Sequence, residues 1–452
     1  MKNFDLVDYD DIFDDIIDFE EELMRNTTPT EAAKEFKNGK MVIAEGCKYS
    51  LDDYATKVSN NVLIVGSVGC GKTRNIVSPN IYEAIGSYVI TDPKGNLYKN
   101  FGDYLRSKGY DVKLLDFVNP EQSVRYNPFG YIKNTQDIFK ISHAIVYSDK
   151  NASATKDPYW ETLAVCFLNS LIGILYEKDK AEKTTDKCNI RNILGLLQDG
   201  VRKDEEFCDT RLTAIFREHQ HRYPDSWACK QFANCGFTPP RTYECIRSTL
   251  VGRLNSFNTV EFEIMLGAND FTFRDIVNKK TAVFVTVSDT DRSLDGIVNL
   301  FYTQAMNELC NYADTECYDN RLPIPVRFIL DDFATNCKIN EFPRMISSFR
   351  SRAISVMLMI QAESQLTACY GDDAQTIISN CDTYAYLGGN DPKTQREVSE
   401  RADRPFREIA FMPIGDCLVF RRGNKPVKTT LINPEKCIEE MLSARPKERE
   451  AC

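Results

Sequence analysis

Short runs of apolar and aromatic residues, each four to seven residues long, alternate with helical patterns from Asn60 to near the end of the chain. Runs that are apolar throughout, rather than at every second position, indicate strands buried on both faces. Because such strands alternate with helices, the pattern predicts an α/β fold with a mostly parallel sheet. The expected strands are 61–66, 87–92, 111–117, 281–288, 326–333, 355–361, 383–389 and 417–423.

The stretch from about Asp157 to Phe271 has a different pattern and contains no clear strand. Leu163, Phe167 and Leu171 recur there at helical spacing, which predicts an all-helical domain inserted into the sheet domain. The charged residues 177–187 are expected to form a solvated loop between helices.

The chain of 452 residues has room for two or three domains, at roughly 150 residues per domain. We expect an acidic N-terminal segment, a sheet domain in two pieces, the helical insertion, and a C-terminal helix with a charged tail. Their expected bounds are, in that order, 1–42, 43–156 with 272–433, 157–271 and 434–452.

The formal net charge of −10 is concentrated at the N-terminus. Residues 1–22 hold ten acidic side chains and one lysine, so the other 430 residues sum to −1. The acidic segment is expected to be a solvated tail or to bind a basic partner surface. Basic residues late in the chain are candidates for DNA phosphate contacts, with ordinary surface charge as the alternative: Arg396, Arg401, Arg404, Arg407, Arg421, Arg422, Lys425 and Lys428.

Features of membrane and secreted proteins are weak in this sequence. The longest apolar stretch, Leu163–Tyr176, has 14 residues, whereas a bilayer span needs about 20. The acidic first residues lack the basic region of a signal peptide. Sixteen cysteines without a CxxC pair are typical of reduced thiols, so we expect a cytoplasmic protein.

Residues 66–73, GSVGCGKT, have the spacing of a phosphate-binding P-loop. They follow the expected strand 61–66 and open a helical pattern, as the chemistry requires. Glycines let backbone N–H groups face phosphate oxygens, and the helix N-terminus adds a positive dipole end. We expect Lys72 to contact the β- and γ-phosphates of ATP and Thr73 to hold Mg²⁺. The other predicted binding residues are Gly66, Ser67, Val68, Gly69, Cys70 and Gly71.

An acidic pair, Asp331–Asp332, ends the expected strand 326–333. Ligand sites of parallel α/β sheets lie at the carboxyl ends of the strands, so this pair is expected to face the P-loop. Asp331 is the candidate ligand of the Mg²⁺ shell, and Asp332 is the candidate residue that orients or activates water. The alternative is a solvated turn.

The strand 355–361 carries candidate polar residues at both ends. Gln361 closes the strand beside the acidic pair, where a glutamine can sense the γ-phosphate. Arg350 precedes the strand and can reach a neighbouring subunit's phosphate as an arginine finger, although Arg352 has an equally suitable spacing. A surface salt bridge is the alternative for either arginine.

A zinc site at His219, His221, Cys229 and Cys235 is the weaker of the metal hypotheses. The spacing H-x-H followed by C-x5-C is not a standard zinc pattern. We therefore expect ordinary residues of a helical domain at these positions.

With these motifs in order, the chain resembles the type IV coupling proteins, the TraG-like conjugative DNA-transfer ATPases of type IV secretion systems. The resemblance spans residues ~43 to ~432 and is more specific than a P-loop alone. It is carried by NVLIVGSVGCGKT, SPN (78–80), ITDPKGNLY (90–98), LDFVNPEQSVRYNPF (115–129), DPYWE (157–161), FILDDFATNCKI (328–339), RSRAISVMLMIQAESQL (350–366), YG (370–371) and LGGND (387–391).

The resemblance implies a RecA-like P-loop domain that carries an all-α domain and assembles as a homo-hexameric ring. It implies ATP-driven passage of single-stranded DNA, with its attached relaxase, toward a secretion channel and its ATPases. By position, Lys72 and Thr73 match the P-loop residues, Asp331 the metal-binding aspartate, Arg350 the arginine finger and Gln361 the sensor glutamine.

Two features depart from the family pattern. Most members have glutamate after the metal-binding aspartate, whereas this chain has Asp332, which is one methylene shorter. An acidic segment also stands where most members have an N-terminal membrane anchor. If this chain works at the inner face of the membrane, we expect a separate membrane-anchoring protein to recruit it.

Three functions are compatible with these motifs. The first is a cytoplasmic ATP-driven motor of conjugative DNA transfer. The second is a DNA translocase or helicase that is not linked to secretion, which the DPKG, RYNPF and DPYWE set disfavours. The third is a nucleotide-gated platform that recruits relaxase or protein substrates and hydrolyses ATP poorly, for which Asp332 is the motive.

Overall fold

The computed structural model describes residues 30–147, 159–201, 210–235, 238–288, 290–317, 319–333 and 338–444. The acidic residues 1–22 lie outside the described residues, and so do Asp157 and Pro158 of the DPYWE motif.

Within these ranges, nine strands form one sheet in the order β11-β10-β9-β3-β8-β7-β4-β6-β5. All neighbours from β9 to β5 are parallel. The fold is therefore α/β with a mostly parallel sheet, as the pattern predicts. The strands are β3 (Val62–Val65), β4 (Ser87–Thr91), β5 (Asp111–Asp116), β6 (Thr281–Thr286), β7 (Val326–Leu330), β8 (Ile354–Ile360), β9 (Thr383–Tyr386), β10 (Asp416–Arg421) and β11 (Val427–Thr430).

One edge of the sheet differs from the expected topology. β10 runs antiparallel to β9, and β11 returns antiparallel to β10 as a hairpin. Sequence reasoning missed β11 because its four residues, VKTT, lie at the sheet edge and are mostly exposed. It also missed the separate hairpin of β1 (Lys40–Ala44) and β2 (Cys47–Ser50), whose turn contains Gly46.

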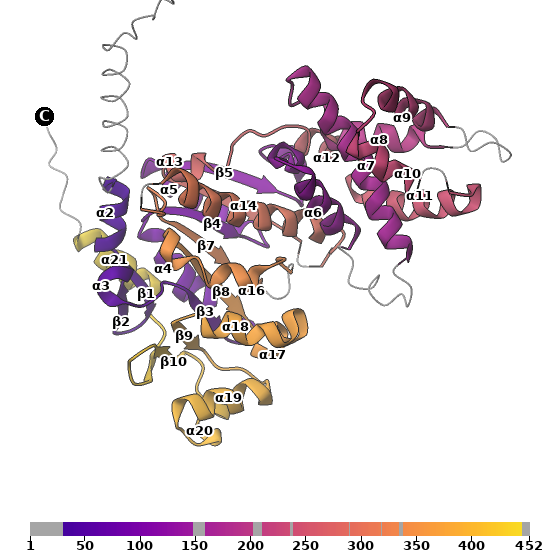
Figure 1. The fold of residues 1–452 in the computed structure, drawn as a ribbon. Helices are drawn as coiled ribbons and strands as arrows, with labels where there is room; N and C mark the ends of the chain where they lie inside the picture. Colours follow the sequence, from indigo (N-terminus) through magenta and orange to yellow (C-terminus); the bar gives the residue numbers. More distant parts are fainter. Residues whose placement is uncertain are drawn as a thin grey trace, which may run out of the picture.

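Helices cover both faces of the sheet (Figure 1). Leu63 and Val65 belong to one hydrophobic core, and Val62 and Ile64 belong to the other. Successive side chains of a strand point to opposite faces, so both faces are buried. The helices around the sheet are α2 (Glu31–Asn38), α3 (Asp53–Thr56), α4 (Ser78–Tyr82), α5 (Asn96–Ser107), α6 (Thr135–Val146), α13 (Asp275–Asn278), α14 (Asp295–Glu316), α16 (Phe342–Ile346), α17 (Glu363–Tyr370), α18 (Ala374–Ser379), α19 (Pro392–Ala402), α20 (Phe406–Ala410) and α21 (Pro434–Ala444).

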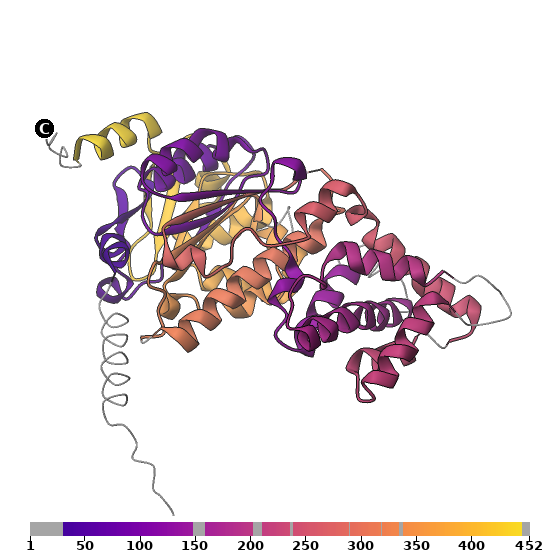
Figure 2. The ribbon, with the colours of Figure 1, turned by 90° about the horizontal axis from the view of Figure 1, so that it is seen from above.

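Residues 159–265 form an all-α insertion that lies beside the sheet (Figures 1 and 2). Its described elements are helical: α7 (Tyr159–Glu182), α8 (Ile190–Asp199), α9 (Arg211–Arg222), α10 (Trp227–Ala233), α11 (Pro240–Leu254), a short turn at Asn255–Phe257 and α12 (Val260–Met265). The inserted all-α domain matches the expectation. Its exact bounds, 157 and 271, remain a proposal.

The central helix α7 is longer than its apolar stretch suggested. It has 24 residues rather than 14, and it extends to Glu182, so half of the expected loop 177–187 is helical. Of the described helices, α7 alone is long and apolar enough to cross a bilayer, which corrects the expectation based on length. Two thirds of its most apolar stretch is buried, and α7 packs against α6, α10 and α11. Burial inside a helical domain explains its composition.

Candidate nucleotide site

The loop 66–71 leaves the sheet at the carboxyl end of β3, between β8 and β9. The Gly66 N–H donates to the Ile360 carbonyl at 3.1 Å, and the Ser67 N–H donates to the Gly388 carbonyl at 3.0 Å. Gly69 and Gly71 have φ angles of +77° and +94°, in the left-handed region that favours glycine. The loop path therefore depends on the two inner glycines of the motif.

Lys72 begins a π-helical segment, η1 (Lys72–Val77), that continues into α4. Its Nζ donates to the carbonyls of Gly66 at 2.6 Å and Ser67 at 3.1 Å, and the residue is only 8% exposed. Its ammonium group thus lies inside the loop, where it can neutralise phosphate charge. Val68 is exposed at the tip of the loop, and burial raises the pKa of the half-buried Cys70 thiol.

Asp331 lies directly after β7 and faces the first turn of the P-loop helix. Its Oδ2 accepts a hydrogen bond of 2.7 Å from Thr73 Oγ1. Burial raises the pKa of the Asp331 carboxyl; Asp332 adds to this effect, whereas Thr73 and Lys72 oppose it. A hydroxyl beside a buried carboxylate is a set of hard oxygen donors that suits Mg²⁺. The residues present therefore fit a magnesium ion.

Asp332 adopts a left-handed backbone conformation, with a φ of +49°. Its N–H donates to Asp331 Oδ1 at 3.1 Å, and its side chain is half-buried. Among residues with a Cβ, aspartate and asparagine tolerate this conformation best because their short polar side chains can hydrogen-bond locally. The left-handed turn thus gives a physical reason for aspartate rather than glutamate at this position.

Gln361 follows β8 at the same edge of the sheet. β8 pairs with β3 through Val65 and Ile360, and with β7 through Leu330 and Leu358. The half-buried Gln361 is held by its own N–H, which donates to Gln365 Oε1 at 2.9 Å. The structure therefore brings the P-loop, the acidic pair and Gln361 to one edge, as the strand pattern predicts.

Arg350 lies at the other end of the strands, in the turn η6 (Arg350–Arg352) that precedes the amino end of β8. The seven residues of β8 place it roughly 20 Å from the P-loop of its own chain, at about 3.3 Å per residue. Its Nη2 donates to the Asp53 carbonyl at 2.8 Å. The structure therefore does not bring Arg350 to the other site residues of the same chain.

Arg352 differs from Arg350 in its charge partner. Its Nε and Nη2 donate to the two carboxylate oxygens of Asp314, each at 2.8 Å. A fork-like pair of this kind engages the whole guanidinium group. In the described part of the chain, Arg350 contacts a main-chain carbonyl instead of a carboxylate, which leaves its charge available for another group.

Comparison with known proteins shows the family to which the chain belongs. Residues 20–403 match the family described as "Type IV secretory system Conjugative DNA transfer". The chain belongs to this family. It is a member of the type IV coupling protein family.

Relatives of this coupling protein are distant in sequence. The type IV secretion system-coupling protein VirD4 of Bartonella henselae is 22% identical over 358 residues, which cover 78% of this chain and 51% of the relative. The chain thus spans about half the length of the curated relatives it matches.

Solved structures share its RecA-like P-loop fold. The conjugative coupling protein TrwBΔN70 with sulphate has a TM-score of 0.64 at 18% identity, covering 89% of this chain and 91% of its own. The plasmid coupling protein TrwB with ADP and Mg²⁺ has a TM-score of 0.61, with the same identity and coverage.

An open pocket of about 460 Å³ lies beside the P-loop of the coupling protein, and of its twelve lining residues sequence reasoning named only Gly69, Cys70 and Gly71. Gly69, Cys70, Gly71, Arg74 and Asn75 line one side, and residues 414–415 and 431–435 line the other. Asn75 Nδ2 donates to the Ile432 carbonyl at 2.8 Å, and Arg74 pairs with Glu435 at 2.6 Å. Ile414 is 97% exposed at its rim. The sequence signal that could have indicated this side of the pocket is the single isoleucine between Pro413 and Gly415, in a segment that is expected to be a turn.

The weaker candidates have structural partners in this coupling protein. His219 Nε2 lies 2.8 Å from Glu177 Oε2, and the Cys229 thiol donates to the Phe216 carbonyl. No group of three or more metal-ligating side chains occurs within the described ranges. Several late basic residues pair with nearby acids, namely Arg401 with Glu363, Arg404 with Glu408, Arg422 with Asp382 and Lys428 with Asp416.

Proposed function

We propose that this coupling protein is an ATP-driven motor that passes a relaxase-bound single strand of DNA to a type IV secretion channel. The observation that carries the proposal is the 2.7 Å contact between Thr73 and Asp331, which lies beside Lys72 and at the same edge as Gln361. A motor needs a site for phosphoryl transfer, and these groups are the ones that such a site uses.

Each residue has a defined task in this proposal. Lys72 neutralises charge on the β- and γ-phosphates, and Thr73 and Asp331 hold the metal ion. Asp332 orients the attacking water and accepts its proton, and Gln361 senses the γ-phosphate. Bound MgATP supplies the phosphoryl group and the metal charge. The loop residues Gly66, Ser67, Val68, Gly69, Cys70 and Gly71 form the phosphate cradle in this proposal.

Arg350 completes the site of a neighbouring subunit in this proposal. It lies too far from the P-loop of its own chain, and among the residues that the structure describes no carboxylate forms an ion pair with it, whereas Asp314 pairs with Arg352. An arginine supplied from a neighbour stabilises the charge of the transferring phosphoryl group. The role requires a ring, and we propose a homo-hexamer.

The partners follow from the same role. We propose that the helical domain, 157–271, faces the relaxase–DNA substrate and that channel ATPases receive it. The motor works at the cytoplasmic face of the membrane. Basic residues near the C-terminal end of the sheet domain, such as the exposed Lys425, are candidates for DNA contacts.

A second function, a nucleotide-gated recruitment platform with poor hydrolysis, is favoured by Asp332 alone. Its carboxylate is one methylene shorter than that of glutamate and leaves the backbone from a left-handed residue. The platform would bind MgATP and relaxase but release little phosphate.

The test is to measure MgATP hydrolysis and the displacement of streptavidin from biotinylated single-stranded DNA by the purified chain. DNA-stimulated hydrolysis with displacement supports the motor. Nucleotide-dependent relaxase binding without turnover supports the platform instead. Displacement without binding to relaxase or to channel ATPases indicates a translocase that is not linked to secretion.

A further inference from the structure

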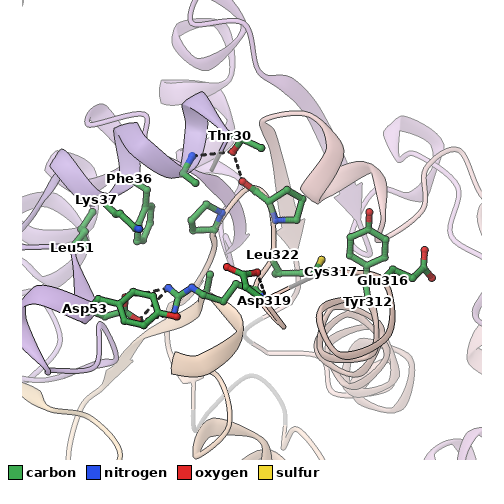
Figure 3. A pocket seen from close by; sticks show the side chains of 16 residues that line it. Thr30, Phe36, Lys37, Leu51, Asp53, Tyr312, Glu316, Cys317, Asp319 and Leu322 are labelled. Atoms are coloured by element: carbon green, nitrogen blue, oxygen red, sulfur yellow. Dashed lines mark hydrogen bonds and ion pairs between the residues drawn. The ribbon is translucent and has the colours of Figure 1, made fainter. Parts of the chain in front are cut away.

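A buried ion pair lies beside Arg350, in a cavity of about 120 Å³ at the edge of the sheet opposite the P-loop. Figure 3 shows Phe36, Lys37, Leu51 and Asp53 on one side of this cavity and Tyr312, Glu316 and Cys317 on the other. Asp53 begins α3, and Arg321 lies in the loop between α14 and β7. None of the nucleotide-site residues lines the cavity.

The pair contacts Arg350 at two separate points. Arg321 Nη2 lies 3.1 Å from Asp53 Oδ1, and Arg321 Nη1 donates to the Arg350 carbonyl at 3.1 Å. In return, Arg350 Nη2 donates to the Asp53 carbonyl at 2.8 Å. Arg321 therefore holds the main chain of Arg350. The main-chain carbonyl of Asp53 holds the guanidinium group of Arg350.

Burial makes this pair sensitive to the loss of either partner. The side chain of Arg321 is 14% exposed and that of Asp53 is 9% exposed. The Arg321 guanidinium also lies over the ring of Tyr54, 4.6 Å from its centroid. Removing one charge would leave the other buried without its counter-charge, so the two hold each other in one geometry.

The turn that carries Arg350 is also attached to the loop that carries Arg321. The N–H of Leu322 donates to the Arg352 carbonyl at 3.1 Å, and the N–H of Val326 donates to the Ala353 carbonyl at 3.0 Å. Ala353 has a φ of +60°, an unusual conformation for alanine that these contacts maintain. The loop thus fixes where the Arg350 side chain leaves the backbone.

We propose that Asp53 and Arg321 are positioning residues that hold the finger Arg350 at the subunit boundary. This inference rests on the proposed role of Arg350 in a neighbour's site. The pair touches neither phosphate nor metal in its own chain. Its loss should therefore slow turnover without weakening nucleotide binding, because Lys72, Thr73 and Asp331 lie at the other edge.

The test compares Arg321→Met and Asp53→Asn with wild type in ATPase and nucleotide-binding assays on assembled full-length protein. We expect kcat to fall about 10- to 100-fold, the cost of a misplaced catalytic group, with the Kd for MgATP unchanged. Arg321→Lys keeps the positive charge but has one nitrogen in place of the two that contact Arg350 and Asp53. Its kcat should therefore lie between those of Arg321→Met and wild type. Arg352→Met is the matched control, because it removes the neighbouring arginine–aspartate pair of the same turn and should keep kcat.

Adding each substitution to Arg350→Ala separates this proposal from the function on which it rests. If positioning is the role, Arg321→Met with Arg350→Ala is no slower than Arg350→Ala alone. Full turnover by Arg350→Ala would overturn the finger role itself. If kcat falls in Arg350→Ala but stays normal in Arg321→Met, the finger role stands and the positioning role is overturned. The positioning role is also overturned if the two losses of kcat multiply in the double variant. Should Arg321→Met fail to fold, Asp53→Asn and Arg321→Lys give the same comparison.

Discussion

Thr73 and Asp331 lie 258 positions apart in the chain, and a hydrogen bond of 2.7 Å joins Thr73 Oγ1 to Asp331 Oδ2. The bond connects the first turn after the P-loop to the end of β7. Two oxygen donors of the kind that suits a magnesium ion therefore lie side by side. The arrangement buries a carboxylate, and its consequences for stability can be measured.

Asp331→Asn should stabilise the nucleotide-free protein at pH 7–8. Burial raises the pKa of Asp331 above its ordinary value, so the folded state binds this proton more tightly than the unfolded state does. The charged carboxylate therefore costs stability above the folded pKa, and this cost disappears as the pH falls to the ordinary aspartate range. Thermal unfolding from pH 4 to 8 should show a higher Tm for Asp331→Asn, with a difference that narrows on acidification. A variant less stable than wild type at pH 8 would contradict this.

Lys72→Ala should abolish ATP turnover and leave the fold intact. The substitution removes the ammonium group inside the loop, together with its bonds to Gly66 and Ser67, but leaves the sheet unchanged. Steady-state hydrolysis at saturating MgATP and thermal unfolding measure the two effects. Lys99→Ala, on the exposed face of α5, is the control for the loss of a lysine. Retained hydrolysis by a folded Lys72→Ala protein would falsify the P-loop assignment.

Asp332→Asn should bind MgATP as wild type does but hydrolyse it at least ~100-fold more slowly, the size of effect expected for losing a general base. Asp332→Glu should keep or raise the rate if the short side chain limits the geometry. Since glutamate tolerates a φ of +49° less well, Asp332→Glu should also lower the Tm slightly. Single-turnover hydrolysis and equilibrium nucleotide binding measure these outcomes. A normal rate for Asp332→Asn would favour activation of water elsewhere.

If each site takes Arg350 from a neighbour, as proposed, ATPase activity should rise more steeply than linearly with protein concentration. Single-stranded DNA should increase the activity by threading the ring and favouring assembly. Arg350→Ala mixed into wild type should depress activity beyond simple dilution, whereas Arg352→Ala should only dilute it. Specific activity against concentration, with mass measured in parallel, tests this. A monomer with a flat profile, unaffected by DNA or by mixing, would remove the finger role.

The central sheet, and most of the residues that meet at the candidate site, could be predicted from the sequence. Continuous apolar runs mark strands buried on both faces, and six of the seven neighbouring pairs between β10 and β5 are parallel. Parallel strands have their carboxyl ends at one edge, so the P-loop, Asp331, Asp332 and Gln361 had to lie there once the strands were recognised. Local pattern was enough because each of these residues directly follows its strand.

Tertiary structure alone decided what depends on distant partners. Arg350 and Arg352 are equivalent by spacing, and only the contact of Arg352 with Asp314, 38 positions away, distinguishes them. Likewise, the antiparallel direction of β10, the exposed edge strand β11 and the Asp53–Arg321 pair leave little local signal. The physical reason is that a charge, a strand direction or a backbone turn takes its meaning from the group that packs against it. Folding, rather than spacing along the chain, brings that group into place.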